Sequence, residues 1–147
     1  IPVMGHIGLM PQSINLTSGY SVQGKQELHA KQIIDEANNL YNSGAFCIVL
    51  EGIPADLAEI ISNQVPIPTI GIGSGKSCDG QIQVFHDVVG LYSNFIPKHA
   101  KQYLNGYSKL LDGLKQYQEE VKIMDFPNSS HSTKLDKNIL EKISENT

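Results

Sequence analysis

Four kinds of feature are missing from this 147-residue sequence, and each absence excludes a class of protein. Only two cysteines occur, Cys47 and Cys78, and neither has a CxxC or other metal-ligand spacing. Eleven Lys and Arg face 15 Asp and Glu without a basic cluster, which argues against a nucleic-acid partner. No apolar run approaches the roughly 20 residues of a membrane helix, and no segment resembles a signal peptide. We therefore expect a cytoplasmic protein with reduced thiols and no membrane partner.

The composition that is present is that of an ordinary globular domain, with 40% hydrophobic and 18% charged residues. The chain begins Ile1-Pro2-Val3, without Met, in what looks like a strand. This start predicts a fragment or a cut chain.

The most informative stretch is Ala45-Phe-Cys-Ile-Val-Leu-Glu51-Gly-Ile-Pro54. A short run rich in Ile and Val predicts a strand buried on both faces, and Gly52 and Pro54 then end it. Glu51 is thus expected at the carboxyl end of a parallel strand, where α/β folds bind ligands. A carboxylate there is a candidate general base, and capping of the next helix or pairing with a Lys is the structural alternative.

The remaining elements alternate along the chain. We expect strands over residues 1–9, ending near Gly5-His6, and over 69–72 and 81–85, the last ended by His86-Asp87. Apolar residues at helical spacing predict helices over residues 25–41, 54–64 and 97–121, with Leu28 and Ile60 among the inward positions. Residues 14–25 read as a loop. The polar tail over residues 125–147 is expected to be partly disordered or weakly helical, over 134–143.

This alternation predicts parallel β/α units. Four units make half of a (β/α)8 barrel, whose usual size is about 250 residues, and a small doubly wound sheet is the other option. The very short strands that end in glycine favour the barrel.

The glycine-rich loop Gly71-Ile-Gly73-Ser-Gly75-Lys-Ser77 resembles a nucleotide-binding loop but fails both patterns. A phosphate loop needs Gly where Ile70 stands, and the three glycines are spaced too closely for a dinucleotide fingerprint. We expect a flexible loop whose backbone approaches a small ligand, with Gly73 lining the site.

Two of the five histidines, His6 and His86, are expected at strand ends and are candidates for lining the site. The other three are expected in solvent: His29, His99 and His131. No His spacing predicts a metal site within this chain. Neither Ser13 nor Ser77 lies in a nucleophile motif, which argues against acyl-transfer hydrolysis.

A series of segments in fixed order resembles the ketopantoate (3-methyl-2-oxobutanoate) hydroxymethyltransferases, from residue 1 to about residue 132. These segments are Pro2-Val-Met-Gly-His-Ile-Gly-Leu9, Pro11-Gln-Ser13, Gly19-Tyr-Ser-Val-Gln-Gly24, Val49-Leu-Glu51-Gly-Ile-Pro54, Ile67-Pro-Thr-Ile-Gly-Ile-Gly73, Cys78-Asp-Gly-Gln81, His86-Asp87, Gly90, Phe126-Pro127 and His131-Ser132.

The resemblance implies a (β/α)8 TIM barrel, of which residues 1–124 cover roughly strands five to eight and the C-terminal helices. It implies transfer of a one-carbon unit from 5,10-methylenetetrahydrofolate to 3-methyl-2-oxobutanoate, giving ketopantoate for pantothenate and coenzyme A biosynthesis. The family's general base matches Glu51. The family uses Mg²⁺, whose ligands lie in the first half of the barrel and so outside this chain, and its members form homo-oligomers.

Two other readings stay open. One is a Mg²⁺-dependent, enolate-forming barrel lyase of the phosphoenolpyruvate mutase or isocitrate lyase kind. The other is a non-catalytic half barrel that assembles with a partner chain. Because half a barrel leaves strand edges unpaired, we expect this chain to be unstable and inactive alone.

Overall fold

The computed structural model describes residues 1–10 and 21–145. The motif residues 11–13, Gly19 and much of the expected loop over 14–25 lie outside this range. The chain divides into two compact units, Ile1–Leu104 and Asn105–Thr147, which are described separately.

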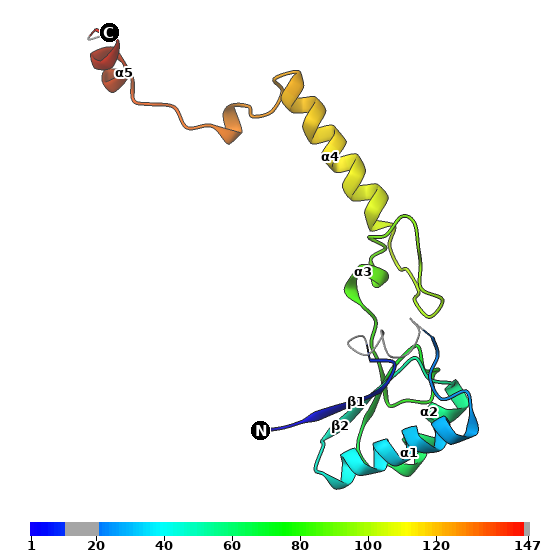
Figure 1. The fold of residues 1–147 in the computed structure, drawn as a ribbon. Coiled ribbons are helices and arrows are strands. Elements are labelled where there is room, and N and C mark those ends of the chain that lie inside the picture. Colours follow the sequence, from blue (N-terminus) through cyan, green and yellow to red (C-terminus); the bar gives the residue numbers. More distant parts are fainter. Residues whose placement is uncertain (11–20, 146–147) are drawn as a thin grey trace. The chain divides into compact units, whose positions relative to one another are not determined.

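The first unit is built on a parallel sheet of four strands in sequence order (Figure 1): β1 (Met4–Gly8), β2 (Cys47–Glu51), β3 (Thr69–Ile72) and β4 (Gly80–Gln81). Helices α1 (Glu27–Asn42) and α2 (Ala55–Gln64) lie side by side against one face of this sheet. The expected strands and helices up to Ile72 are confirmed within a few residues. Sequential strand order with helices on one face is consistent with a partial barrel, since a doubly wound sheet carries helices on both faces.

The core lies between the sheet and the two helices. The residues that form it are Ile7, Ile33, Ala37, Ile48, Leu50, Ile53, Leu57, Ala58, Ile61 and Val65. Burial of each large aliphatic side chain contributes about 1.5–3 kcal/mol. Among the expected inward positions, Leu28 (82%), Tyr41 (40%) and Ile60 (45%) are exposed, so these expectations are wrong. Ile60 lies about 100° around α2 from Ile61, which takes the inward position.

The other face of the sheet carries different side chains. Because successive strand residues point to opposite faces, Leu50 points to the helices and Glu51 away from them. The alternate positions His6, Val49 and Ile70 share the face of Glu51 and are partly exposed, whereas Ile7 and Ile48 are buried beneath the helices. The described strands are thus fully covered on one face only, so the expected burial of the Glu51 strand on both faces is wrong. His6 and Glu51 lie on the open face.

The expected strand over 81–85 is wrong beyond Gln81, and His86 does not end a strand. After Gly80 and Gln81 pair with β3, the chain turns, and the Val84 carbonyl accepts hydrogen bonds from the amides of Asp87 and Val88. These bonds start a short helix, α3 (Phe85–Val88). Local hydrogen bonding therefore decides a segment whose apolar alternation predicted a strand.

The expected helix over 97–121 begins later, at α4 (Gly106–Lys122). Before it, backbone donors bond to distant segments: the Lys101 amide to Gln83 Oε1 (2.7 Å) and the Tyr103 amide to the Val88 carbonyl (2.8 Å). An amide that bonds elsewhere cannot donate within a helix. Asn105 then caps α4 by accepting from the Ser108 amide.

The second unit contains α4, a short 3₁₀ turn (Ser129–His131) and α5 (Lys137–Ser144), which confirms a helix near the expected 134–143. The large apolar side chains of α4, such as Leu110, Leu114 and Tyr117, are exposed. Over the part of the chain that the structure describes, no helix has the length and apolar character needed to cross a membrane.

Candidate active site

Glu51 is the last residue of β2, as predicted, and its backbone is held on both sides. Its carbonyl accepts a hydrogen bond from the Leu9 amide at the end of β1 (2.7 Å). The next amide, of Gly52, donates to the Ile72 carbonyl at the end of β3 (2.9 Å). Gly52 then adopts a φ of 58°, which turns the chain away from the sheet toward α2. The neighbouring strands thus set the direction in which the Glu51 side chain leaves the backbone.

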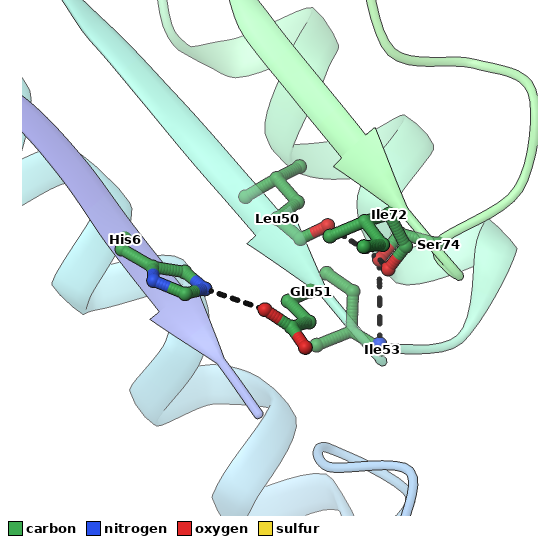
Figure 2. A network of polar contacts seen from close by, with 6 residues as sticks. All are labelled: His6, Leu50, Glu51, Ile53, Ile72 and Ser74. Atoms are coloured by element: carbon green, nitrogen blue, oxygen red, sulfur yellow. Dashed lines mark hydrogen bonds and ion pairs between the residues drawn. The ribbon is translucent and has the colours of Figure 1, made fainter. Parts of the chain in front are cut away.

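The Glu51 carboxylate on β2 is hydrogen-bonded to the His6 side chain on the neighbouring strand β1, on the open face of the sheet (Figure 2). His6 Nε2 lies 3.0 Å from Glu51 Oε2, although the residues are 45 positions apart in sequence. The donor in this hydrogen bond is set by the tautomer of His6, and an ionised carboxylate would accept from Nε2. The side chains are 35% and 21% exposed, so both are accessible from solvent. His6 itself lies within β1, opposite Val49, and its expected place at a strand end is corrected.

Gly8, opposite Glu51 in the strand register, makes this arrangement sterically feasible. Its φ is 93°, in the left-handed region that favours glycine. A Cβ added to Gly8 would overlap the carbonyl oxygen of Glu51 and lie 2.8 Å from Cγ2 of Ile53. The absence of a side chain at Gly8 therefore allows the ends of β1 and β2 to approach each other.

The other two predicted site residues have different surroundings. Gly73 follows β3 with a φ of 63°, and a Cβ there would lie 3.1 Å from Cβ and Cγ of His99. His99, expected in solvent, is exposed and lies beside this backbone. His86 stacks on Tyr92, with ring centroids 6.0 Å apart. Among the described residues, no hydrogen bond or ring contact joins Gly73 or His86 to the His6–Glu51 pair, and their roles stay predictions.

Ser74 is a residue of this region that the sequence reading missed. It is fully buried, and its hydroxyl bonds to backbone groups on both sides of Glu51 (Figure 2). The available signal was a polar side chain between two glycines directly after a buried strand. Such a hydroxyl is buried only when it is hydrogen-bonded, because an unpaired one costs about 1–3 kcal/mol.

The glycine-rich loop was expected to be flexible. In the structure, hydrogen bonds fix the segment after it, Asp79 to Gln81, to β3 and to the loop backbone. Asp79 Oδ2 accepts from the backbone amide (2.8 Å) and the hydroxyl (2.9 Å) of Thr69, and Gln81 Nε2 donates to the Gly75 carbonyl (2.8 Å). Ser62 Oγ lies 2.8 Å from the Thr69 hydroxyl and extends the chain of bonds. The Thr69 amide first, and then the Thr69 hydroxyl, hold the pKa of Asp79 below its usual range.

Replacement of Asp79 by Asn tests this anchor. The pKa is lowered on folding, so the stabilisation is complete above the ordinary value of 3.8 and is lost as pH falls through the lower folded value. Because Asp79 is exposed, we expect Asp79→Asn to cost about 1 kcal/mol or less at pH 7. Thermal melting at pH 7 and near pH 3 should show this difference shrinking in acid. The same substitution at Asp35, exposed on α1, is the control, and a pH-independent cost at position 79 would contradict the ionic contribution.

An open hollow of about 350 Å³ lies along β1, the edge strand of the sheet, against α1. The residues that line it are His6, Ile7, Met10, Glu36, Asn39, Leu40 and Ser43. Glu51 does not line it. In the part of the chain that the structure describes, β1 pairs with β2 alone, so the hollow lies at an edge of the sheet.

The described residues do not fit a Mg²⁺ site. Within residues 1–10 and 21–145, no group of three His, Cys, Asp or Glu side chains could hold a metal ion. The carboxylate of Glu51 is already hydrogen-bonded to His6. Mg²⁺ prefers several oxygen ligands in octahedral geometry, which a single paired carboxylate does not provide.

Comparison with known proteins agrees with these features. A family model described as ketopantoate hydroxymethyltransferase matches residues 1–129. The chain is 53% identical over 143 residues to the 3-methyl-2-oxobutanoate hydroxymethyltransferase of Clostridium beijerinckii, which covers 97% of this chain and 52% of the relative. The enzyme of that name from Carboxydothermus hydrogenoformans is 51% identical with the same coverage, and that of Clostridium kluyveri 54% over 142 residues, with 97% and 51% covered.

The chain thus spans about half the length of the curated relatives it matches. The match runs from the β1 segment through α4 to the 3₁₀ turn, and so includes His6, Glu51 and Ser74. With its parallel β/α units and a carboxylate at a strand end, this chain belongs to the ketopantoate hydroxymethyltransferase family.

Proposed function

We propose that this chain supplies the general base of an enzyme that transfers a hydroxymethyl group to 3-methyl-2-oxobutanoate, giving ketopantoate for pantothenate and coenzyme A biosynthesis. The one-carbon donor in this proposal is 5,10-methylenetetrahydrofolate. The observation that carries it is the Glu51 carboxylate at the end of β2, hydrogen-bonded to His6 at 3.0 Å. Family membership supports the reaction class, and the geometry supports the assignment of the base.

The reaction requires removal of a proton from the substrate carbon next to the ketone. The resulting enolate then forms a carbon–carbon bond with the methylene carbon carried by the folate. Water supplies the hydroxyl oxygen of the product, the bond between this carbon and the folate nitrogen breaks, and tetrahydrofolate leaves. In our proposal Glu51 takes this proton, as a positioned carboxylate can. His6 engages Oε2, and no described residue bonds to Oε1, so Oε1 is the oxygen that receives the proton.

Mg²⁺ enters the proposal only through the family, because the described residues of this chain do not fit it. We propose that its ligands, like the first strands of a (β/α)8 barrel, are supplied outside these 147 residues. The free edge of β1 and the hollow beside it support the docking of further β/α units there. In this arrangement residues 1–124 form the second half of the barrel and residues 125–147 a tail.

Solvent exchange tests the proposal and separates it from the lyase alternative. We expect the natural-length protein that carries this chain to exchange the C3 proton of 3-methyl-2-oxobutanoate for deuterium in D₂O. Nuclear magnetic resonance follows the exchange, and product should appear when 5,10-methylenetetrahydrofolate is added. Cleavage of a 2-methylisocitrate-type substrate, with no exchange of the 2-oxo acid, would instead support a lyase.

The 147-residue chain alone is expected to give neither exchange nor product. Its open sheet face and unpaired β1 edge leave the site incomplete in this proposal. The measurement is the same assay at equal molar concentration, with the natural-length protein as the control. Full activity from the chain alone would contradict the half-barrel proposal while leaving Glu51 as the candidate base.

A further inference from the structure

Three exposed lysines of the first unit lack a partner carboxylate, and we call them the lysine cluster: Lys76, Lys98 and Lys101. The first lies in the glycine-rich loop after β3, and the other two lie in the segment before α4. Among residues 1–10 and 21–145, no carboxylate forms an ion pair with any of them. Between residues 60 and 111 the only acids are Asp79, which is bonded to β3, and Asp87, which is 6% exposed. The charges of the lysine cluster are therefore not neutralised within the described chain.

Two glutamines hold the two lysine-bearing segments close together. Gln81 Nε2 donates to the Gly75 carbonyl (2.8 Å), one residue before Lys76. Gln83 Oε1 accepts from the Lys101 amide (2.7 Å). Residues two positions apart are separated by at most about 7 Å along the chain, so the groups that these glutamines bind are neighbours. The sequence alone shows no basic cluster, because these lysines lie far apart in it.

The lysine-bearing segments lie at the same end of the sheet as the proposed base. A Cβ added to Gly73, directly after β3, would lie 3.1 Å from Cβ and Cγ of His99, the residue that follows Lys98. The hydroxyl of Ser74 accepts from the Ile53 amide, two residues after Glu51 (Figure 2). The glycine-rich loop is thus bonded to the turn after β2 on one side and lies against the segment before α4 on the other.

We propose that the lysine cluster binds the glutamate tail of the folate donor. This inference rests on the proposed function, in which 5,10-methylenetetrahydrofolate brings its methylene carbon to the enolate beside Glu51. The tail is joined to the reacting end of the folate through a benzoyl group, so it extends from Glu51 toward the edge of the site. Its glutamate carries an α-carboxylate and a side-chain carboxylate, and each added glutamate brings a further one. Lysine ammonium groups on flexible stems bind carboxylates without a fixed geometry, which suits a tail of variable length.

Equilibrium binding to the natural-length protein tests this proposal, with tetrahydrofolate and its triglutamate form as probes. We expect Lys76→Gln, Lys98→Gln and Lys101→Gln each to raise the Kd of the triglutamate by about 2- to 5-fold, the effect of losing one exposed ion pair. Tetrahydropteroate, which lacks the glutamate, should bind the parent and the variants equally. High salt should reduce the difference between parent and variants for the triglutamate, because exposed charges are screened.

Two controls separate charge from folding. Lys109→Gln, at an exposed position of α4, removes the same charge outside the cluster and should leave the Kd of every probe unchanged. Lys101 Nζ also lies 4.9 Å from the centroid of the Tyr103 ring. Thermal melting therefore checks that Lys101→Gln keeps the fold, and Lys98→Gln, for which the described residues show no ring contact, carries the comparison if it does not.

The outcomes separate this inference from the proposed function. An unchanged Kd for the triglutamate in the lysine variants, or an equal rise for tetrahydropteroate, would overturn the tail assignment and leave the proposed function standing. A raised KM for 3-methyl-2-oxobutanoate with unchanged folate binding would also overturn it, because the cluster would then bind the carboxylate of the 2-oxo acid. A parent protein that neither exchanges the C3 proton nor binds tetrahydrofolate would overturn the proposed function, and this inference with it.

Discussion

Glu51→Gln in the natural-length protein is expected to lower kcat by about 10²–10⁴-fold, the usual contribution of a general base. The amide keeps the shape of the carboxylate, and its oxygen can still accept from His6 Nε2, so the local geometry is preserved. It cannot take a proton from carbon. The loss should therefore appear in kcat, with a much smaller change in KM.

Two measurements make the Glu51 result specific. Deuterium exchange at C3 of 3-methyl-2-oxobutanoate should fall in parallel with turnover, because both require the same proton removal. Glu59→Gln, an exposed position on α2, is the matched control and should leave both rates unchanged. A fall in turnover of less than about 10-fold in Glu51→Gln would show that another group is the base.

Gly8→Ala is expected to have the largest effect on stability among single substitutions near the site. The new Cβ would overlap the Glu51 carbonyl oxygen, and the backbone at φ 93° is strained for any side chain. We expect a cost of about 3–5 kcal/mol in the free energy of unfolding. Surviving folded enzyme should also turn over more slowly, because the clash is relieved by separating the ends of β1 and β2.

Gly44→Ala provides the matched control for this prediction. Gly44 has nearly the same φ, 89°, but a Cβ added there would lie more than 4 Å from every heavy atom beyond the adjacent residues. Its expected cost is the strain of left-handed backbone alone, about 1–2 kcal/mol. Urea or thermal unfolding of both variants measures the difference, which isolates the steric overlap at Glu51. Equal losses in the two variants would contradict the close approach of β1 and β2.

The sequence predicted well the helices and strands that a local spacing of apolar residues specifies. Apolar residues at helical spacing predicted α1 and α2, and the short apolar runs ended by glycine predicted β2 and β3. It was wrong where distant backbone partners or local turns decide the structure. The expected helix from residue 97 begins at Gly106 because Gln83 and Val88 bind the preceding amides. The strand over 81–85 gives way to α3 because the Val84 carbonyl accepts from the amides of Asp87 and Val88.

The same division holds within the site. By itself the sequence determined that Glu51 ends a strand, because an apolar run followed by Gly52 leaves few other places for it. Only the tertiary structure decided what surrounds the carboxylate. The pairing with His6, the close approach at Gly8 and the bridge made by Ser74 depend on the register of three parallel strands. Register arises from the packing of the whole sheet against α1 and α2, which no local pattern of residues encodes.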